Sequence, residues 1–381
     1  MFQRILTTPK TSILLLGPRG TGKSTWIRKH FPHEPTYNLL TTSEALRLSR
    51  DPSLLFHELE HLSPDSWVVI DEVQKVPELL NEVHRLMEEK KLRFILCGSS
   101  ARKLKRAGTN LLAGRARLVH FFPLTSKEID FDFKPSHAIE HGMLPTALTA
   151  EDPKSYLTSY AEVYLKEEIK EEALTRNIGS FARFLEVAAR QNGQVTNVSD
   201  IARDAGVARQ TVQGFFEILV DTLIGSWLQA WKLKRATKQI AHPKFYFFDS
   251  GVARSLSGRL PYPPLPEEIG ALLETLLHHE LVSYFSYSGL NYPLTFWRSH
   301  DDVEVDFFFE TDRGYVAIEC KSASIWKKDF QKGLHRMKQE VGKSKVKCIG
   351  VYLGERRAQY DDVSIYPLKE FLQMLWSGDI C

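Results

Sequence analysis

Cysteine is scarce in this chain of 381 residues, and its few positions lie far apart. Cys97, Cys320, Cys348 and Cys381 form no CxxC pair. The spacing therefore predicts neither a cysteine-ligated zinc site nor a disulfide framework. A reducing compartment suits such a chain.

Long apolar runs are missing as well. No stretch approaches the roughly 18 consecutive apolar residues that a membrane-spanning helix requires. The first ten residues also lack the apolar core of a signal peptide. We therefore expect a cytoplasmic protein.

Neither sign of charge dominates the chain. Lysine and arginine number 50 and the acids 47, which gives a net charge of +3. This balance permits nucleic acid as a partner without indicating it, because polyanion binding depends on local basic patches. The composition is 43% hydrophobic and 25% charged. With no low-complexity tract, it predicts a folded chain of two or three domains.

The first 150 residues alternate short apolar runs with amphipathic stretches. Residues 12–16, 67–70 and 94–97 are typical of buried strands, whereas residues 78–90 have apolar positions at helical spacing. Strands alternating with helices predict an α/β domain with a parallel sheet over residues 1–150.

The rest of the chain divides at a proline-rich break at residues 260–268. Residues 151–262 predict a helical domain that ends in a β-hairpin. Residues 263–381 predict a second α/β module. Its expected elements are a helix over 269–287, strands over 294–298, 303–309 and 315–321, a helix over 329–341 and a strand over 346–353.

A phosphate-binding motif follows the first expected strand. The sequence GPRGTGKS at residues 17–24 matches GxxxxGK[ST], and a helix is expected from Lys23. Glycines let backbone N–H groups converge on phosphates, and the helix N-terminus adds its positive dipole end. Lys23 is expected to reach the β and γ phosphates and Ser24 to bind Mg²⁺. An accidental glycine-rich turn is the alternative. The expected nucleotide-binding residues are Gly17, Pro18, Arg19, Gly20, Thr21, Gly22, Lys23, Ser24 and Thr25.

Two acids follow the second expected strand. The strand delivers Asp71 and Glu72 to the carboxyl end of the sheet, where ligands bind in such folds. Asp71 would hold Mg²⁺ through water, and Glu72 would orient or deprotonate an attacking water. The pair favours hydrolysis over the other phosphoryl chemistries. The simpler alternative is a buried strand that ends in two solvated acids.

Polar residues after the third strand complete the expected site. Ser99 or Ser100 would act as a sensor beside the γ-phosphate, although serine is also a common turn residue. In ring-shaped ATPases an arginine of one subunit completes the neighbour's site. Arg115 is the expected finger, with Arg117 in reserve. A solvated surface arginine is the alternative.

Residues 199–220 fit a helix-turn-helix, with the turn at Gly206 and donor-bearing side chains early in the second helix. The basic stretch 231–244 would then be a wing that tracks phosphates. A winged-helix spacer that contacts protein is the alternative. The expected DNA-contacting residues are Arg209, Gln210, Thr211, Gln213, Lys232, Lys234, Arg235 and Lys238.

The C-terminal module carries a second group of reactive side chains. Strand alternation places Asp306 on one face of its strand, and Glu319 and Lys321 on one face of the next. A short turn joins the two strands, so the three can converge in an arrangement suited to Mg²⁺-assisted phosphodiester hydrolysis, with Asp306 and Glu319 holding the metal. Glu274, on the apolar side of its helix, would join them. A structural salt-bridge network is the alternative, and such folds are often kept for binding alone.

Six segments in this order resemble the bacterial and archaeal AAA+ ATPases that carry a winged helix and a C-terminal PD-(D/E)xK nuclease-like domain, formerly described as a domain of unknown function. They are GPRGTGKST, VVIDEVQK, CGSSARKL, LAGRARLVHFFPLTSKEI, KFYFFDSGVARSL and VEVDFFFE…YVAIECKS. The resemblance covers nearly the whole chain, although its ATPase motifs are common to many ATPases. It implies an AAA+ fold, ATP and Mg²⁺ as cofactors, Arg115 acting in trans, and a homo-oligomeric ring that we expect to be hexameric.

Three functional hypotheses follow. The first is an oligomeric ATP-driven motor that remodels or translocates DNA, including branched DNA such as Holliday junctions during branch migration. The second is a structure-directed, ATP-dependent nuclease that cuts with Asp306, Glu319 and Lys321. The third is an ATP-switched signalling or scaffold protein whose modules bind protein.

Overall fold

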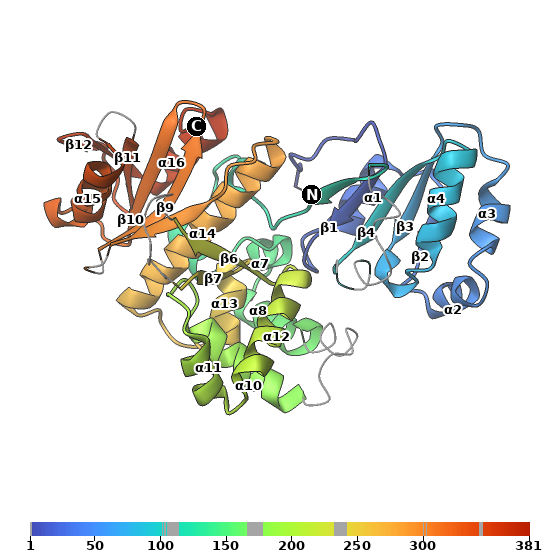
Figure 1. Ribbon diagram of the computed structural model, residues 1–381, viewed down its shortest axis with the longest axis horizontal. Coiled ribbons are helices and arrows are strands. Elements are labelled where there is room, and N and C mark those ends of the chain that lie inside the picture. Colours follow the sequence, from blue (N-terminus) through green and yellow to red (C-terminus); the bar gives the residue numbers. More distant parts are fainter. Residues whose placement is uncertain are drawn as a thin grey trace.

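The computed structural model describes residues 2–100, 102, 104, 114–165, 178–231, 242–299, 301, 303–342 and 346–381. A parallel sheet lies at one end of the molecule and a larger mixed sheet at the other, with a helical region between and below them (Figure 1). None of the helices in the described ranges is long and apolar enough to span a membrane.

The N-terminal domain is the expected α/β fold. Its five strands are all parallel and lie in the order β2-β3-β4-β1-β5. Its elements are β1 (Ile13–Leu16), α1 (Lys23–His30), β2 (Thr36–Asn38), α2 (Thr42–Arg50), α3 (Leu54–Leu59), β3 (Trp67–Asp71), η1 (Val73–Lys75), α4 (Leu79–Glu89), β4 (Arg93–Gly98) and β5 (Arg117–His120).

Helices cover both faces of this sheet, which explains its apolar strands. Successive residues of a strand point to opposite faces. Val68 and Ile70 accordingly pack in the core formed with α2, α3 and α4, whereas Val69 packs in the core formed with Trp26 of α1. Because both faces are buried, the carboxyl ends of the strands are where functional side chains can reach solvent.

The segment that follows the sheet leaves it before residue 150. Its first helices pack against α13 and α14, and Phe133, Ile139 and Met143 belong to the C-terminal core. The domain expected over residues 1–150 therefore ends earlier, because the apolar side chains after β5 are buried elsewhere. The elements of this middle region are η3 (Ser126–Ile129), α6 (Pro135–His141), α7 (Pro145–Thr149), α8 (Pro153–Ser159), η4 (Tyr160–Leu165), α10 (Ile178–Arg190), α11 (Val198–Ala205), α12 (Arg209–Asp221), β6 (Gly225–Ala230), β7 (Lys244–Phe247) and α13 (Ser250–Leu256).

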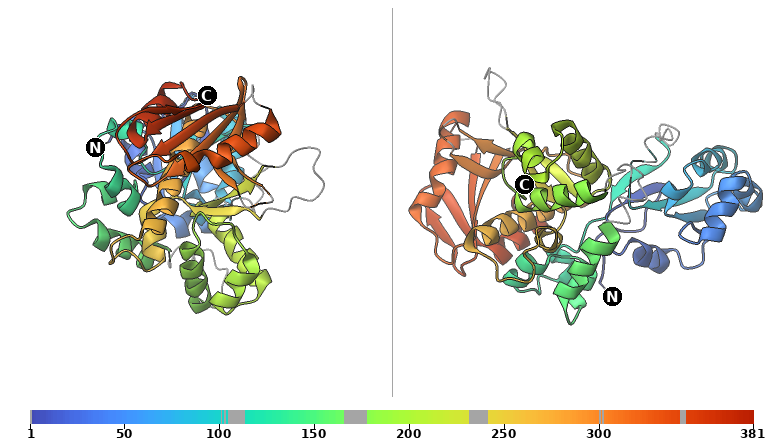
Figure 2. Two further views of the ribbon diagram at one scale, coloured as in Figure 1. Left: turned by 90° about the vertical axis from the view of Figure 1, so that its left-hand side faces the viewer. Right: turned by 90° about the horizontal axis from the view of Figure 1, so that it is seen from below.

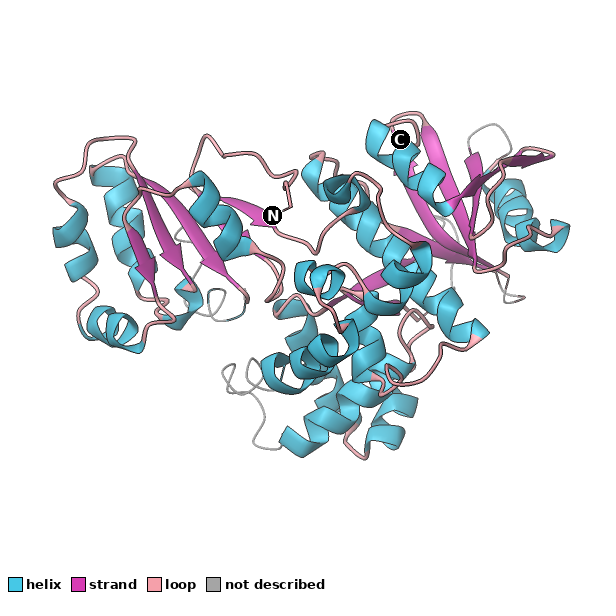
Figure 3. Cartoon of the chain, turned by 180° about the vertical axis from the view of Figure 1, so that it is seen from behind, coloured by secondary structure: helices cyan, strands magenta, loops and turns pink. Residues whose placement is uncertain are grey.

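The C-terminal elements begin and end within a few residues of the expected positions, and two strands and a helix follow them. They are α14 (Pro266–Tyr287), β8 (Thr295–Arg298), β9 (Glu304–Thr311), β10 (Gly314–Lys321), η5 (Lys328–Gln331), α15 (Lys332–Val341), β11 (Val346–Tyr352), β12 (Ala358–Tyr360), β13 (Val363–Pro367) and α16 (Leu368–Ser377). Figure 3 shows these strands and their helices from behind.

The hairpin of β6 and β7 joins the C-terminal sheet. The eight-stranded sheet has the order β12-β13-β11-β10-β9-β8-β6-β7, with β6 parallel to β8. Tyr246 of β7 packs in the C-terminal core, whereas Phe245 and Phe247 pack in the core of the central helices. Strands on both sides of the boundary expected near residue 262 therefore belong to one continuous sheet. Figure 2 shows the central helices between the two ends of the molecule.

Candidate functional site

The glycine-rich loop connects β1 to α1, and its geometry depends on glycine. Gly22 caps α1 with φ 94°, a conformation that other residues adopt with strain. A Cβ on Gly17 would lie 2.1 Å from the carbonyl oxygen of Phe121. The ammonium of Lys23 donates hydrogen bonds to the carbonyl oxygens of Gly17 (2.6 Å) and Pro18 (2.9 Å). Lys23 therefore lies against the loop that the motif assigns to phosphate.

The two acids expected at the end of β3 lie next to this loop. The Ser24 hydroxyl donates to Asp71 Oδ2 at 2.9 Å, so the two side chains proposed to share Mg²⁺ already face each other. Glu72 has φ 59°, a left-handed conformation that is uncommon for a residue other than glycine. Its carboxylate accepts hydrogen bonds from the amide of Gln74 and, at 3.4 Å, from the hydroxyl of Ser99.

Ser99 and Ser100 have different partners. Gln74 Nε2 also donates to Ser99 Oγ at 3.1 Å, so Ser99 belongs to the group around Glu72. The Ser100 hydroxyl instead accepts the backbone N–H of Arg102 at 3.2 Å. Gln74 was not among the expected site residues. Its position two residues after the acid pair is the sequence feature that could have identified it.

Arg115 and Arg117 lie away from the glycine-rich loop of their own chain. Arg115 Nε donates to Glu88 Oε1 of α4 at 2.6 Å, and both side chains are exposed. Arg117 is exposed at the start of β5.

A cavity of about 390 Å³ adjoins the loop. It lies between the N-terminal segment, the start of α1 and α7. Its volume is in the range of small-molecule sites. Its lining residues include Phe2, Arg4, Gly22, Thr25, Trp26 and Thr146.

The middle region also contacts the loop directly. The Tyr160 hydroxyl donates to the carbonyl oxygen of Arg19 at 2.9 Å. A Cβ on Gly20 would lie 3.1 Å from the Tyr156 hydroxyl and 3.3 Å from the Tyr160 ring. The loop is therefore packed against α8 and η4.

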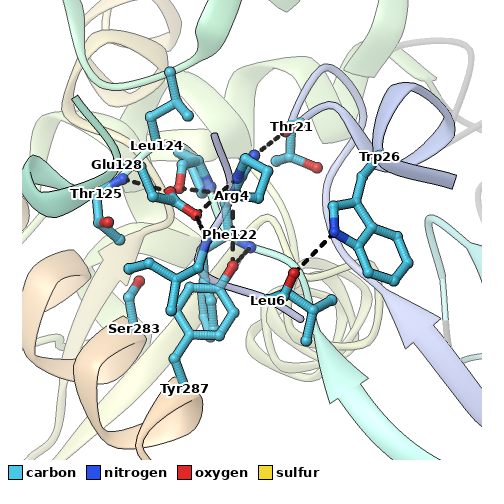
Figure 4. A network of polar contacts seen from close by, with 12 residues as sticks. Arg4, Leu6, Thr21, Trp26, Phe122, Leu124, Thr125, Glu128, Ser283 and Tyr287 are labelled. Carbon is cyan, nitrogen blue, oxygen red and sulfur yellow. Dashed lines mark hydrogen bonds and ion pairs between the residues drawn. The ribbon is translucent and has the colours of Figure 1, made fainter. Parts of the chain in front are cut away.

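Arg4 is the centre of a buried polar network (Figure 4). Its Nε donates to Glu128 Oε1 at 2.8 Å, and its Nη1 donates to the carbonyl oxygen of Thr21 in the glycine-rich loop at 2.6 Å. Nη2 donates to the carbonyl oxygen of Phe122 at 2.7 Å. Nη2 also lies 3.5 Å from the Tyr287 hydroxyl of α14. One guanidinium therefore joins the loop, the segment after β5 and the C-terminal region.

Glu280 makes a second buried connection between the segment after β5 and the C-terminal region. Its carboxylate accepts the Ser126 N–H (2.7 Å), the Ser126 hydroxyl (3.1 Å) and Trp376 Nε1 (2.7 Å). Burial raises the pKa of Glu280 to about 7, although these donors act against the shift.

We expect Glu280 to make stability dependent on pH. The unfolded carboxyl ionises near its ordinary pKa of 4.5, whereas the buried one stays protonated up to about 7. The unfolded state therefore loses its proton first, and the stability that Glu280 contributes falls as pH rises from about 4.5 to 7, by on the order of 3 kcal/mol. Urea unfolding of wild type and Glu280→Gln at pH 5 and pH 8 tests this. The difference between the two proteins should shrink at pH 8, and a difference that does not change with pH would contradict the expectation.

The helices expected around Gly206 are present as α11 and α12. Gly206 adopts φ 65°, and Ile201, Ala205 and Val212 are buried between the helices. The expected contact residues at the start of α12, namely Arg209, Gln210, Thr211 and Gln213, are all exposed. Lys232, Lys234, Arg235 and Lys238 lie outside the described residues.

The C-terminal acids and Lys321 meet as expected, and they have additional partners. Lys321 is paired with Glu319, and Asp306 Oδ2 accepts the Cys320 N–H at 2.7 Å. Glu274 Oε2 accepts the Tyr246 hydroxyl at 2.9 Å and lies 3.3 Å from the ammonium of Lys244. Lys244 is also paired with Glu304.

Burial and the neighbouring charges shift the pKa values of these groups. Burial raises the pKa of Glu274 to about 7, and the charge of Asp306 acts in the same direction. The same two causes raise the pKa of Glu319 well above its ordinary value. Burial opposes the charge on Lys244, but Glu274, Asp306 and Glu304 outweigh it and raise the pKa of Lys244.

Lys244 and Arg4 are central residues that the sequence did not single out. A lysine in the aromatic run of β7 was a usable signal for Lys244, because a buried charge needs a partner. Arg4 precedes every recognisable motif, so the sequence held no comparable signal for it.

Three family models match the chain in succession. An AAA domain covers residues 9–130, and two domains of unknown function, DUF8612 and DUF4143, cover residues 134–262 and 269–371. Uncharacterized proteins of Mycobacterium tuberculosis and Mycobacterium bovis are each 28% identical over 322 residues. These alignments cover 82% of this chain and 70% of each relative.

Solved structures also align, among them those of an ORC1 protein and a RuvB mutant. The Aeropyrum pernix ORC1 protein in complex with DNA has a TM-score of 0.27 at 13% identity, covering 66% of this chain and 87% of its own. A point mutant of Thermotoga maritima RuvB has a TM-score of 0.30 at 14% identity, covering 57% and 81%. At these scores neither structure is a guide to the function of this chain. The AAA match, the parallel sheet and the loop before α1 together show that residues 9–130 have the fold of an AAA domain with a P-loop.

Proposed function

We propose that this protein is an oligomeric, ATP-hydrolysing AAA+ motor that binds DNA and remodels or translocates it, branched DNA such as a Holliday junction included. The observation that supports the proposal is the presence, in one chain, of the P-loop residues and of the helix pair α11 and α12, whose second helix begins with exposed polar side chains. Lys23 lies against the carbonyl oxygen of Gly17, and Ser24 contacts Asp71. Arg209 and Gln213 are exposed in the first turns of α12.

The P-loop residues divide the chemistry of ATP hydrolysis among them. Lys23 and the loop N–H groups would hold the phosphates, and Ser24 and Asp71 would hold Mg²⁺, which supplies charge stabilisation when bound. Glu72 would accept a proton from the attacking water, with Gln74 and Ser99 fixing its carboxylate. The cavity beside Gly22 would take the nucleoside.

A ring of subunits would complete the ATP site, because each subunit would supply an arginine to its neighbour. Arg115 is the proposed finger, and its exposed ion pair with Glu88 has little stability to lose when Arg115 turns toward a neighbouring subunit. A hexamer is the assembly that we propose. Strand cleavage is not part of the proposal, because internal cations and backbone donors already contact the C-terminal acids.

The test is steady-state ATP hydrolysis with and without duplex and four-way junction DNA at physiological salt. DNA should stimulate the wild type several-fold. The stimulation should weaken in Arg209→Ala/Gln213→Ala, because these side chains lie where a recognition helix contacts a groove. Lys332→Ala, which removes an exposed cation of α15, is the matched control and should behave as the wild type.

Two results would redirect the proposal. Failure of every DNA to bind in a gel-shift titration would remove DNA as the substrate. Hydrolysis that is indifferent to DNA, together with a stoichiometric protein partner, would favour the ATP-switched signalling or scaffold protein.

A further inference from the structure

Lys244 lies at the centre of the acidic cluster in the C-terminal region. Its side chain is 4% exposed, and its ammonium lies 3.3 Å from Glu274 Oε2 and is paired with Glu304. The ring of Phe296 lies beneath it, with its centroid 5.4 Å away. The lysine reaches the cluster from β7, a strand of the middle region, and not from the α/β module that supplies the acids.

The acids of the cluster also have other partners within the chain. Lys321 is paired with Glu319, and Arg298 lies 3.9 Å from Glu304. Asp306 Oδ2 accepts the Cys320 N–H at 2.7 Å. Four acids (Glu274, Glu304, Asp306 and Glu319) thus face three cations of the chain (Lys244, Arg298 and Lys321).

This arrangement does not fit a divalent metal. A Mg²⁺ or Mn²⁺ site needs several oxygen ligands directed at one point. In the part of the chain that the structure describes, no group of three or more His, Cys, Asp or Glu side chains is arranged to hold a metal ion. Glu319 Oε2 is buried without a hydrogen-bond partner, but the other oxygen of this carboxylate is taken by Lys321. One bare oxygen is not a coordination site.

We propose that Lys244 is the resident cation of this cluster, that it takes the place of a divalent metal, and that the cluster is a structural junction between the middle region and the C-terminal sheet. The geometry of β7 supports this role. Lys244 and Tyr246 alternate onto the same face of the strand and both contact Glu274. The residues between and after them, Phe245 and Phe247, pack in the core of the central helices. The ion pairs of Lys244 therefore fix a strand that two cores share.

The first experiment is Mn²⁺ binding to the full-length, nucleotide-free protein, measured as free Mn²⁺ by electron paramagnetic resonance. Wild type and Asp306→Asn/Glu319→Gln should bind the same number of ions. Ser24→Ala is the matched control, because it removes any Mn²⁺ held at the P-loop. A bound ion that wild type and Ser24→Ala both retain and that Asp306→Asn/Glu319→Gln loses would overturn the proposal, because that ion would lie at the C-terminal acids and not at the P-loop.

The second experiment removes the internal cation. Lys244→Met keeps most of the side-chain volume and leaves the acids without their ammonium. We expect the unfolding midpoint to fall by roughly 5–10 °C, and added Mn²⁺ to recover part of the loss. Lys244→Met/Glu274→Gln removes an acid as well and should be more stable than Lys244→Met, so the comparison remains possible if the single variant folds poorly. A Lys244→Met protein as stable as wild type would contradict the assignment.

Discussion

Replacement of Glu72 by glutamine is expected to lower the rate of ATP hydrolysis about 100-fold to 1,000-fold while ATP still binds. The glutamine keeps the shape of the side chain and can still accept hydrogen bonds from Gln74 and Ser99. It cannot accept a proton from water. The phosphate-binding parts, Lys23 and Ser24, are unchanged, so the loss should fall on kcat and leave the affinity for ATP nearly intact.

Lys23→Ala is the matched comparison, because it removes the ammonium that lies against the loop and should reduce ATP binding itself. Equilibrium binding of a fluorescent ATP analogue together with steady-state turnover separates the two variants. A Glu72→Gln protein that hydrolyses ATP at the wild-type rate would remove Glu72 as the base. Loss of binding in Glu72→Gln would instead show that the left-handed turn after β3 had collapsed.

Replacement of Glu128 by alanine is expected to destabilise the protein by about 3–5 kcal/mol, because it leaves a buried guanidinium without its partner. The side chains of Arg4 and Glu128 are 7% and 0% exposed. Glu128 also accepts the backbone N–H groups of Ile5 and Thr125, at 2.8 and 3.0 Å. These donors would lose their acceptor in the variant. Urea unfolding measures the effect.

The double variant Arg4→Met/Glu128→Leu is the control for Glu128→Ala. Replacing both charges by apolar groups of similar size should recover part of the stability lost in the single variant. The double variant should still have a raised KM for ATP, because the hydrogen bond from Arg4 to Thr21 in the glycine-rich loop is gone. An unfolding free energy for Glu128→Ala within about 1 kcal/mol of wild type would show that the Arg4–Glu128 ion pair does not stabilise the fold.

The sequence alone determined the parts of the molecule in which function depends on consecutive residues. The glycine-rich loop, the apolar strand before Asp71 and the helix from Lys23 were predictable because local spacing fixes their geometry. Strand alternation also predicted that Asp306, Glu319 and Lys321 would meet. Where a short turn or a repeated spacing controls the backbone geometry, the local sequence is enough to predict the local structure.

Only the tertiary structure decided which distant groups share these sites. The sequence separates Arg4 from Glu128, and Lys244 from Glu274, by many residues, and no periodicity links them. The same holds for β6, which pairs with β8 across the proline-rich break and so joins the hairpin of the middle region to the C-terminal sheet. A buried charge needs a partner, but the sequence does not show which residue that partner is. The packing of α14 beside β7 supplied Glu274 as the partner of Lys244, and the segment after β5 supplied Glu128 as the partner of Arg4.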